Sequence, residues 1–139
     1  MPVACAAVDT SPFIYLFEGS DHRTGRAVEL FRSLAAWRTI TSVITPVEVL
    51  THCKREEEEE LAARYIEFFK STPGLAVMPV DWDVALQAAT LRATYRMRVP
   101  DAIQAATAIV HGADVFITND RRLTKVTEVK VVLFDEWTP

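Results

Sequence analysis

Short apolar runs alternate along this chain with segments in which apolar residues recur at helical spacing. Apolar runs of strand length without polar alternation are typical of strands that are covered on both faces, as in parallel sheets. Where helices separate such strands, the sheet is mainly parallel and the helices flank both of its faces. We therefore predict an α/β fold with five strands, at residues 3–8, 39–43, 75–80, 115–118 and 129–134.

Several polar residues and prolines between these runs are signals for helix starts. Ser11 precedes Pro12, which predicts a helix with Ser11 as its N-cap and the proline at its first position. Thr45-Pro46-Val47-Glu48 has the form of a capping box and predicts a helix directly after the second strand. Asp81 is expected to cap a later helix, and Pro100 to open the last one.

The length and composition are those of one folded unit. The chain has 139 residues, and 50% of them are hydrophobic, which is enough to build a single buried core. Only 24% are charged, and no long Ser, Gly or Pro stretch and no internal repeat is present. We expect a single domain over residues 1–139.

The beginning of the chain and its cysteines bear on location. Residues 1–8 are apolar, but they lack a basic start and end at Asp9, well short of the ~18 residues that a membrane span requires. We expect a buried strand in a soluble protein. Cys5 and Cys53 form no CxxC pair, so both are expected to be reduced core thiols, which favours the cytoplasm.

The net charge of −4 argues against a protein that coats nucleic acid nonspecifically, because such proteins are usually basic. It does not exclude an enzyme that binds nucleic acid locally. Five consecutive glutamates at 56–60 are expected to form the solvated face of a helix. The basic residues gather in two other places, at Arg92, Arg96 and Arg98 and at Arg121, Arg122 and Lys125.

Four acids fall at equivalent places relative to the predicted strands. Asp9 directly follows the first strand, and Asp120 follows the fourth after one intervening residue. Glu48 and Asp101 are expected in the first turns of two helices. In open parallel sheets, ligands bind at the carboxyl ends of the strands, near the point where the strand order reverses. We therefore expect the four carboxylates to gather at that edge.

Each acid also has an ordinary structural explanation. Glu48 could complete a capping box, Asp101 could complement a helix dipole, and Asp9 and Asp120 could be turn residues. Together, however, crowded carboxylates repel one another and require a cation or protonation. Carboxylates without Cys or His suit Mg²⁺ or Mn²⁺, which points to phosphoryl chemistry. The three histidines share no helix face or short spacing and are assigned no catalytic role; we expect surface or helix-end positions for His22, His52 and His111.

The chain resembles the PIN-domain family, and most closely its VapC-type toxins, over nearly its whole length. The resemblance rests on an ordered set of four motifs, each containing one acid: Val8-Asp9-Thr10-Ser11-Pro12-Phe13-Ile14, Thr45-Pro46-Val47-Glu48-Val49-Leu50, Pro100-Asp101-Ala102-Ile103-Gln104-Ala105-Ala106 and Phe116-Ile117-Thr118-Asn119-Asp120. It implies a metal-dependent endoribonuclease with Asp9, Glu48, Asp101 and Asp120 as the metal-binding acids.

The same resemblance implies supporting residues and partners. Ser11, Thr118 and Asn119 match polar positions of the family and would support the acids. A homodimer and a small antitoxin, encoded nearby and lying in the active-site groove, are implied as well. Arginines near two of the acids along the chain are candidates for contacts with RNA phosphates, although they could equally be exposed residues that aid solubility: Arg96, Arg98, Arg121 and Arg122.

Two other functions remain open. Asp9-Thr10 after a strand and a late Asn119-Asp120 resemble aspartate-nucleophile phosphatases, but the usual second aspartate of their first motif is replaced by Ser11. A noncatalytic PIN-like module could bind RNA or protein without cleavage. It would be freer to lose acids, and this chain keeps all four.

Overall fold

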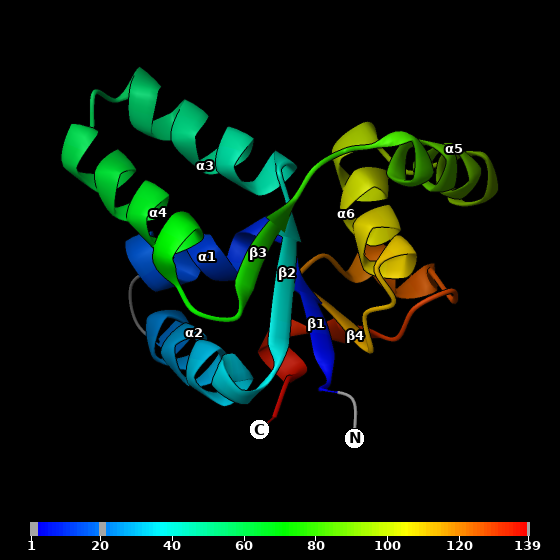
Figure 1. Cartoon of the computed structure of the whole chain (residues 1–139), viewed down its shortest axis with the longest axis horizontal. Coiled ribbons are helices and arrows are strands. Elements are labelled where there is room, and N and C mark those ends of the chain that lie inside the picture. Colours follow the sequence, from blue (N-terminus) through cyan, green and yellow to red (C-terminus); the bar gives the residue numbers. More distant parts are fainter. Residues whose placement is uncertain (1–2, 20–21, 139) are drawn as a thin grey trace.

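Five parallel strands form one sheet in the order β3-β2-β1-β4-β5 (Figure 1). The computed structural model describes residues 3–19 and 22–138. Met1 and Pro2, which precede the predicted first strand, lie outside this part. The strands are β1 Cys5–Val8, β2 Arg38–Ser42, β3 Leu75–Met78, β4 Val115–Thr118 and β5 Val131–Leu133. The predicted α/β fold with a parallel five-stranded sheet is confirmed; β4 has the predicted bounds, β2 is shifted by one residue, and β1, β3 and β5 are two or three residues shorter than predicted.

Helices flank both faces of the sheet (Figure 1). The described residues form six α-helices: α1 Thr10–Glu18, α2 His22–Ser33, α3 Ile44–Arg55, α4 Glu59–Ser71, α5 Trp82–Tyr95 and α6 Val99–Val110. Helices α1 to α4 cover one face and α5 and α6 the other. Short 3₁₀ turns lie at Leu34–Ala36, Arg121–Lys125 and Phe134–Glu136. No helix in the described ranges has the length and apolar character needed to cross a membrane.

The central strand β1 contributes to both halves of the core because successive side chains of a strand point to opposite faces. Ala6 and Val8 pack into the cluster that contains Phe13 of α1. Cys5 and Ala7 pack into the cluster that contains Ala102 of α6. All four strand residues are buried, which explains why this strand is apolar throughout rather than alternating. Cys5 and Cys53 are both buried free thiols, as expected.

The strand order creates a switch point beside β1. The chain passes from β1 to β2 and β3 on one side and then crosses to β4 on the other side. Connections therefore leave the carboxyl ends of β1 and β4 in opposite directions, and a crevice forms between them in folds of this kind. Asp9 and Asp120 follow these two strand ends.

Two of the predicted helix starts are wrong. Helix α1 begins one residue before Ser11, and Asp9 rather than Ser11 is its N-cap, because the Asp9 side chain accepts a hydrogen bond from the Thr10 backbone N–H. Helix α3 begins at Ile44, so Thr45 and Glu48 form no capping box; the Ser42 hydroxyl accepts from Ile44 N instead. Glu48 consequently lies in the second turn of α3, whereas Asp101 lies in the first turn of α6 as expected.

Other local expectations had mixed outcomes. Asp81 caps α5 by accepting a hydrogen bond from Val84 N, as predicted, and α6 begins one residue before Pro100. The glutamate run is exposed, but only its last two residues are helical. Residues 56–58 instead form the turn between α3 and α4, with Glu57 at a φ of 54°. The expectation of a single helix face was therefore wrong.

Candidate functional site

Asp9 is a buried acid at the carboxyl end of β1, with 9% of its surface exposed. One carboxylate oxygen accepts a hydrogen bond from Thr10 N at 2.8 Å. The other accepts from the Thr118 hydroxyl, at the end of β4, at 2.7 Å. The Asp9 backbone N–H also bonds to Ile117 O at 2.9 Å. Both adjacent strand ends thus fix this side chain in one orientation.

Glu48 is linked to Asp9 through their shared neighbour Thr10. The Thr10 hydroxyl donates to Glu48 Oε1 at 2.7 Å, while the Thr10 backbone holds Asp9. Helices α1 and α3 start at the same edge of the sheet (Figure 1), which brings Asp9, the N-cap of α1, near Glu48 of α3. Thr10 therefore links Asp9 to Glu48, through its backbone N–H and its hydroxyl. It was not among the site residues predicted from the sequence.

The buried side-chain amide of Gln104, on α6, supports Thr10 in this position. Gln104 was also absent from the site residues predicted from the sequence. Its Nε2 lies 3.3 Å from the Thr10 hydroxyl and 2.8 Å from the Thr45 hydroxyl. Thr45 in turn bonds to Thr41 at 2.7 Å, and the Thr41 hydroxyl donates to Val8 O. Gln104 is 2% exposed and stands in an otherwise apolar stretch of α6. A polar residue alone in an apolar stretch was the signal in the sequence for this network, because a buried amide requires hydrogen-bond partners.

Asp101 and Asp120 are each paired with an arginine. Asp101 Oδ2 accepts from Arg98 Nε at 3.1 Å, and 16% of its side chain is exposed. Asp120 makes a two-pronged pair with Arg122, with Nη2 to Oδ2 at 2.7 Å and Nε to Oδ1 at 3.0 Å. The hydrogen bonds and charge of Arg122, together with the charge of Arg98, lower the pKa of Asp120. Two of the suggested phosphate-binding arginines therefore neutralise predicted acids.

The other suggested arginines and supporting residues are placed differently. Arg121 pairs with Glu136 at 3.0 Å, and Arg96 is the exposed C-cap of α5. Thr118 contacts Asp9 directly, whereas Asn119 donates to the Tyr15 hydroxyl at 3.0 Å. No hydrogen bond joins Ser11 to any of the four acids, all of which lie in the described part of the chain.

The charges of Asp101 and Glu48 act on the buried carboxylate of Asp9. Burial raises the pKa of Asp9 to about 6, the hydrogen bonds from Thr118 and Thr10 oppose this rise, and the charges of Asp101 and Glu48 add to it. Asp120 belongs to the same edge through the Thr118 hydroxyl, which accepts from Asp120 N at 3.1 Å. Asp9 is therefore the centre of the carboxylate group.

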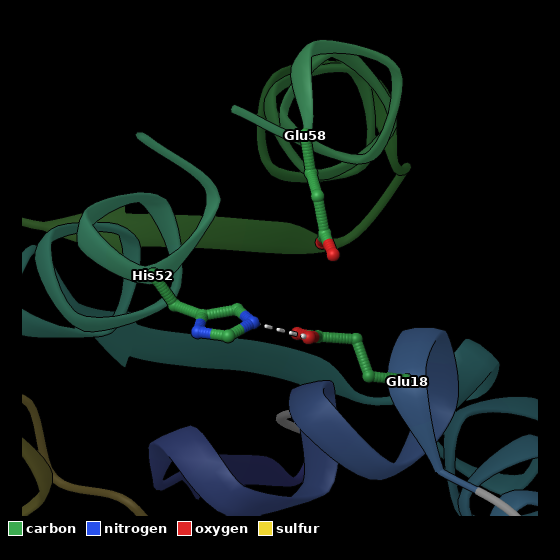
Figure 2. Close-up of side chains that lie close together, drawn as sticks. All are labelled: Glu18, His52 and Glu58. Atoms are coloured by element: carbon green, nitrogen blue, oxygen red, sulfur yellow. Dashed lines mark ion pairs between the residues drawn. The ribbon is translucent and has the colours of Figure 1, made fainter. Parts of the chain in front are cut away.

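No three of the four carboxylates, all in the described part of the chain, have donor oxygens within 4.8 Å of one another. Within residues 3–19 and 22–138, one group of three potential metal ligands does meet this limit. It consists of Glu18, His52 and Glu58, shown in Figure 2.

All three histidines occupy the expected helix-end positions: His22 begins α2, His52 is in the last turn of α3, and His111 is the C-cap of α6.

The carboxylate edge has the chemistry of a site for a hard divalent cation. Its donors are oxygens alone, and the raised pKa of Asp9 reflects negative charge that burial and two neighbouring acids make unfavourable. A cation of charge +2 would relieve that repulsion, and carboxylate donors suit Mg²⁺ or Mn²⁺. The residues present therefore fit such an ion.

Comparison with known families assigns the fold. The sequence model of the PIN domain matches residues 6–129, which is most of the chain and includes all four acids. The chain belongs to the PIN-domain family. No match was found among curated proteins.

Solved structures similar to this PIN domain come from toxin–antitoxin systems. A toxin–antitoxin complex from Klebsiella pneumoniae is 27% identical, with a TM-score of 0.70, over 91% of this chain and 95% of that chain. Two more distant ones show the fold alone. VapC20 of Mycobacterium tuberculosis, a sarcin-ricin loop cleaving toxin, is 22% identical with a TM-score of 0.70, over 90% and 98% of the two chains. DNA-bound VapBC of Salmonella typhimurium is 19% identical with a TM-score of 0.77, over 94% and 98%.

The raised pKa of Asp9 predicts an unusual pH dependence of the metal-free PIN domain. Between about pH 4 and 6, the folded chain holds a proton on Asp9 that the unfolded chain has released, so stability falls as the pH rises. The difference between the ordinary pKa of an aspartate and the pKa of Asp9 in the folded chain corresponds to at most about 3 kcal/mol. Urea unfolding in EDTA across this range, compared with Asp9→Asn, measures it. A constant difference between the two proteins across the range would contradict the prediction.

Replacing Gln104 should show how much its hydrogen bonds to Thr10 and Thr45 stabilise the folded chain. Gln104→Leu keeps the approximate size but leaves the buried Thr10 and Thr45 hydroxyls short of a partner, so we expect a loss of about 1–3 kcal/mol in the free energy of unfolding. Gln87→Leu, on the half-buried side of α5, is the matched control and should change it by less than about 0.5 kcal/mol. Equal losses in the two variants would argue against the network.

Proposed function

We propose that this PIN domain is a Mg²⁺-dependent endoribonuclease and the toxin of a type II toxin–antitoxin pair. The observation that carries the proposal is the convergence of acids from separate elements around the buried Asp9, at the switch point of a parallel sheet. The similarity to the Klebsiella pneumoniae toxin–antitoxin complex supports the biological role.

Asp9 and Asp101 would be the main ligands of the cation, and Glu48 and Asp120 would complete the site directly or through water. One or two Mg²⁺ ions, with Mn²⁺ as a substitute, would supply the charge that orients a water for in-line attack and stabilises the leaving 3′ oxygen. The proton of the attacking water would pass to one of the four carboxylates. Thr118 and Thr10 hold Asp9 in the orientation that this arrangement requires.

The arginine pairs suggest how RNA would be held at this edge. The guanidinium groups of Arg98 and Arg122 pair with the carboxylates of Asp101 and Asp120. If these carboxylates held a cation instead, the guanidinium groups would be available to phosphate oxygens, which they match in geometry. Arg96 and Arg121 are exposed candidates for more distant phosphates.

The partners follow from the family. We propose a homodimer that binds a small antitoxin encoded by a neighbouring gene, with the antitoxin covering the active-site groove. The reduced thiols of Cys5 and Cys53 are compatible with action in the cytoplasm.

The nuclease activity is tested on purified protein freed of antitoxin. It should cleave a structured RNA with Mg²⁺ or Mn²⁺ and stop on addition of EDTA. Asp9→Asn and Asp101→Asn should each reduce the cleavage rate at least about 100-fold, since even outer partners of metal ligands contribute 10–100-fold in metal affinity or activity. Asp83→Asn, an exposed acid in the first turn of α5, is the control and should cleave normally.

The alternatives give different results in the same assay. RNA binding without any metal-dependent cleavage would favour a noncatalytic module. Release of phosphate from a small phosphomonoester, dependent on Asp9, would favour a phosphatase. Cleavage undiminished by EDTA would overturn the metal mechanism.

The toxin role has a separate test in cells. Induced expression should arrest growth of the native host, Asp9→Asn should not, and co-expression of the neighbouring reading frame should restore growth. Active nuclease without arrest would leave an RNA-cleaving enzyme with a different duty.

A further inference from the structure

Glu18, His52 and Glu58 come from three segments and direct their donor atoms toward one point (Figure 2). Glu18 ends α1, His52 lies in the last turn of α3, and Glu58 immediately precedes α4. None belongs to the proposed nuclease site. We propose that these three side chains form a second metal site, for a borderline divalent cation of the Zn²⁺ class.

The spacing of the donor atoms suits a metal better than a direct contact. His52 Nε2 lies 3.6 Å from Glu18 Oε1, which is too long for a hydrogen bond. Zinc lies about 2.0–2.2 Å from imidazole nitrogen and carboxylate oxygen, and tetrahedral angles then separate the two donor atoms by about 3.4 Å. The third donor, from Glu58, lies within 4.8 Å of both. Small side-chain rotations would therefore bring all three onto one ion, with solvent completing the coordination.

Glu18 is held in place from outside the cluster. The hydroxyl of the buried Tyr65 donates to Glu18 Oε2, which leaves Oε1 facing His52. The Glu18 side chain is 21% exposed and the His52 side chain 53%, and all three residues of the cluster lie at the surface. Hydrogen bonds to a ligating carboxylate from a residue behind it orient the ligand and reduce the entropy lost when the ion binds.

The local charge favours a cation, and the donor set selects its class. Five glutamates, at 56–60, follow His52 after Cys53 and the two basic residues Lys54 and Arg55, so acids outnumber bases in this stretch. None of the five glutamates forms an ion pair with a Lys or Arg of the described residues. The imidazole nitrogen distinguishes this cluster from the carboxylate edge, because imidazole suits Zn²⁺, Co²⁺ or Ni²⁺ and not Mg²⁺. Bound there, the ion would tie the end of α1 to the turn between α3 and α4.

The site lies near the carboxylate edge but does not share its ligands. Glu18 is about 13 Å along α1 from Asp9, given the rise of 1.5 Å per residue. His52 is one helical turn beyond Glu48 on α3. A test must therefore keep the two sites apart, and excess Mg²⁺ can do so by saturating the oxygen-only site.

The experiment is a calorimetric titration of the full chain with Zn²⁺ in excess Mg²⁺. We expect one Zn²⁺ per chain, and an affinity at least about 10-fold weaker in His52→Gln and in Glu58→Gln. His111→Gln and Glu56→Gln make the same chemical changes outside the cluster and should bind as the unaltered chain does. Zn²⁺ should also raise the melting temperature of the unaltered chain but not that of His52→Gln. Because RNA cleavage is not measured, the result is independent of the nuclease proposal.

Two outcomes would overturn the site. One is the absence of Zn²⁺ binding in excess Mg²⁺. The other is equal weakening by Glu56→Gln and Glu58→Gln, which would mean that the acidic turn attracts cations without a defined geometry. Tyr65→Phe gives a graded check, since loss of its hydrogen bond should weaken Zn²⁺ binding about 10-fold while leaving one ion per chain. Unchanged affinity in that variant would contradict the role of Tyr65 as an anchor.

Discussion

The burial of a carboxylate at the end of the central strand is the constraint on which the rest of this structure depends. Asp9 has little contact with water and compensates with bonds to Thr10 N and Thr118 Oγ1. Those bonds hold the start of α1 and the end of β4 in fixed positions. Burial and neighbouring charge nevertheless leave the carboxylate with a pKa near 6. The fold thus tolerates an unfavourable group at the place where a cation would make it favourable.

The fold class was predictable because burial on both faces leaves a strong signal in a strand. Cys5–Val8 is apolar without interruption, and the same holds for Val115–Thr118 up to its last residue. Helix starts were less predictable, since several polar residues compete to cap each one. Asp9 caps α1 where Ser11 was expected, and near the start of α3 Ser42 rather than Thr45 accepts a hydrogen bond, from Ile44 N. Which side chain reaches a free N–H is decided only after the chain has packed.

The positions of the acids were predictable from their place in the chain, but their contacts were not. Asp9 and Asp120 follow adjacent strands, and this alone predicts the shared edge. The pairing of Arg122 with Asp120, and the approach of Gln104 to Thr10, depend on side chains that meet only after the helices pack. The roles of the four acids in catalysis rest on the family and on the proposed chemistry.

The amide of Gln104 reaches from the helical layer formed by α5 and α6 to Thr10 and Thr45 in the opposite layer. Its two bonds therefore cross the open end of the sheet, where no strand connects the layers. Separation of the layers at this end would break both bonds at once. Local opening of α1 should consequently be coupled to that of α6, so that their backbone amides exchange with solvent as one cooperative unit.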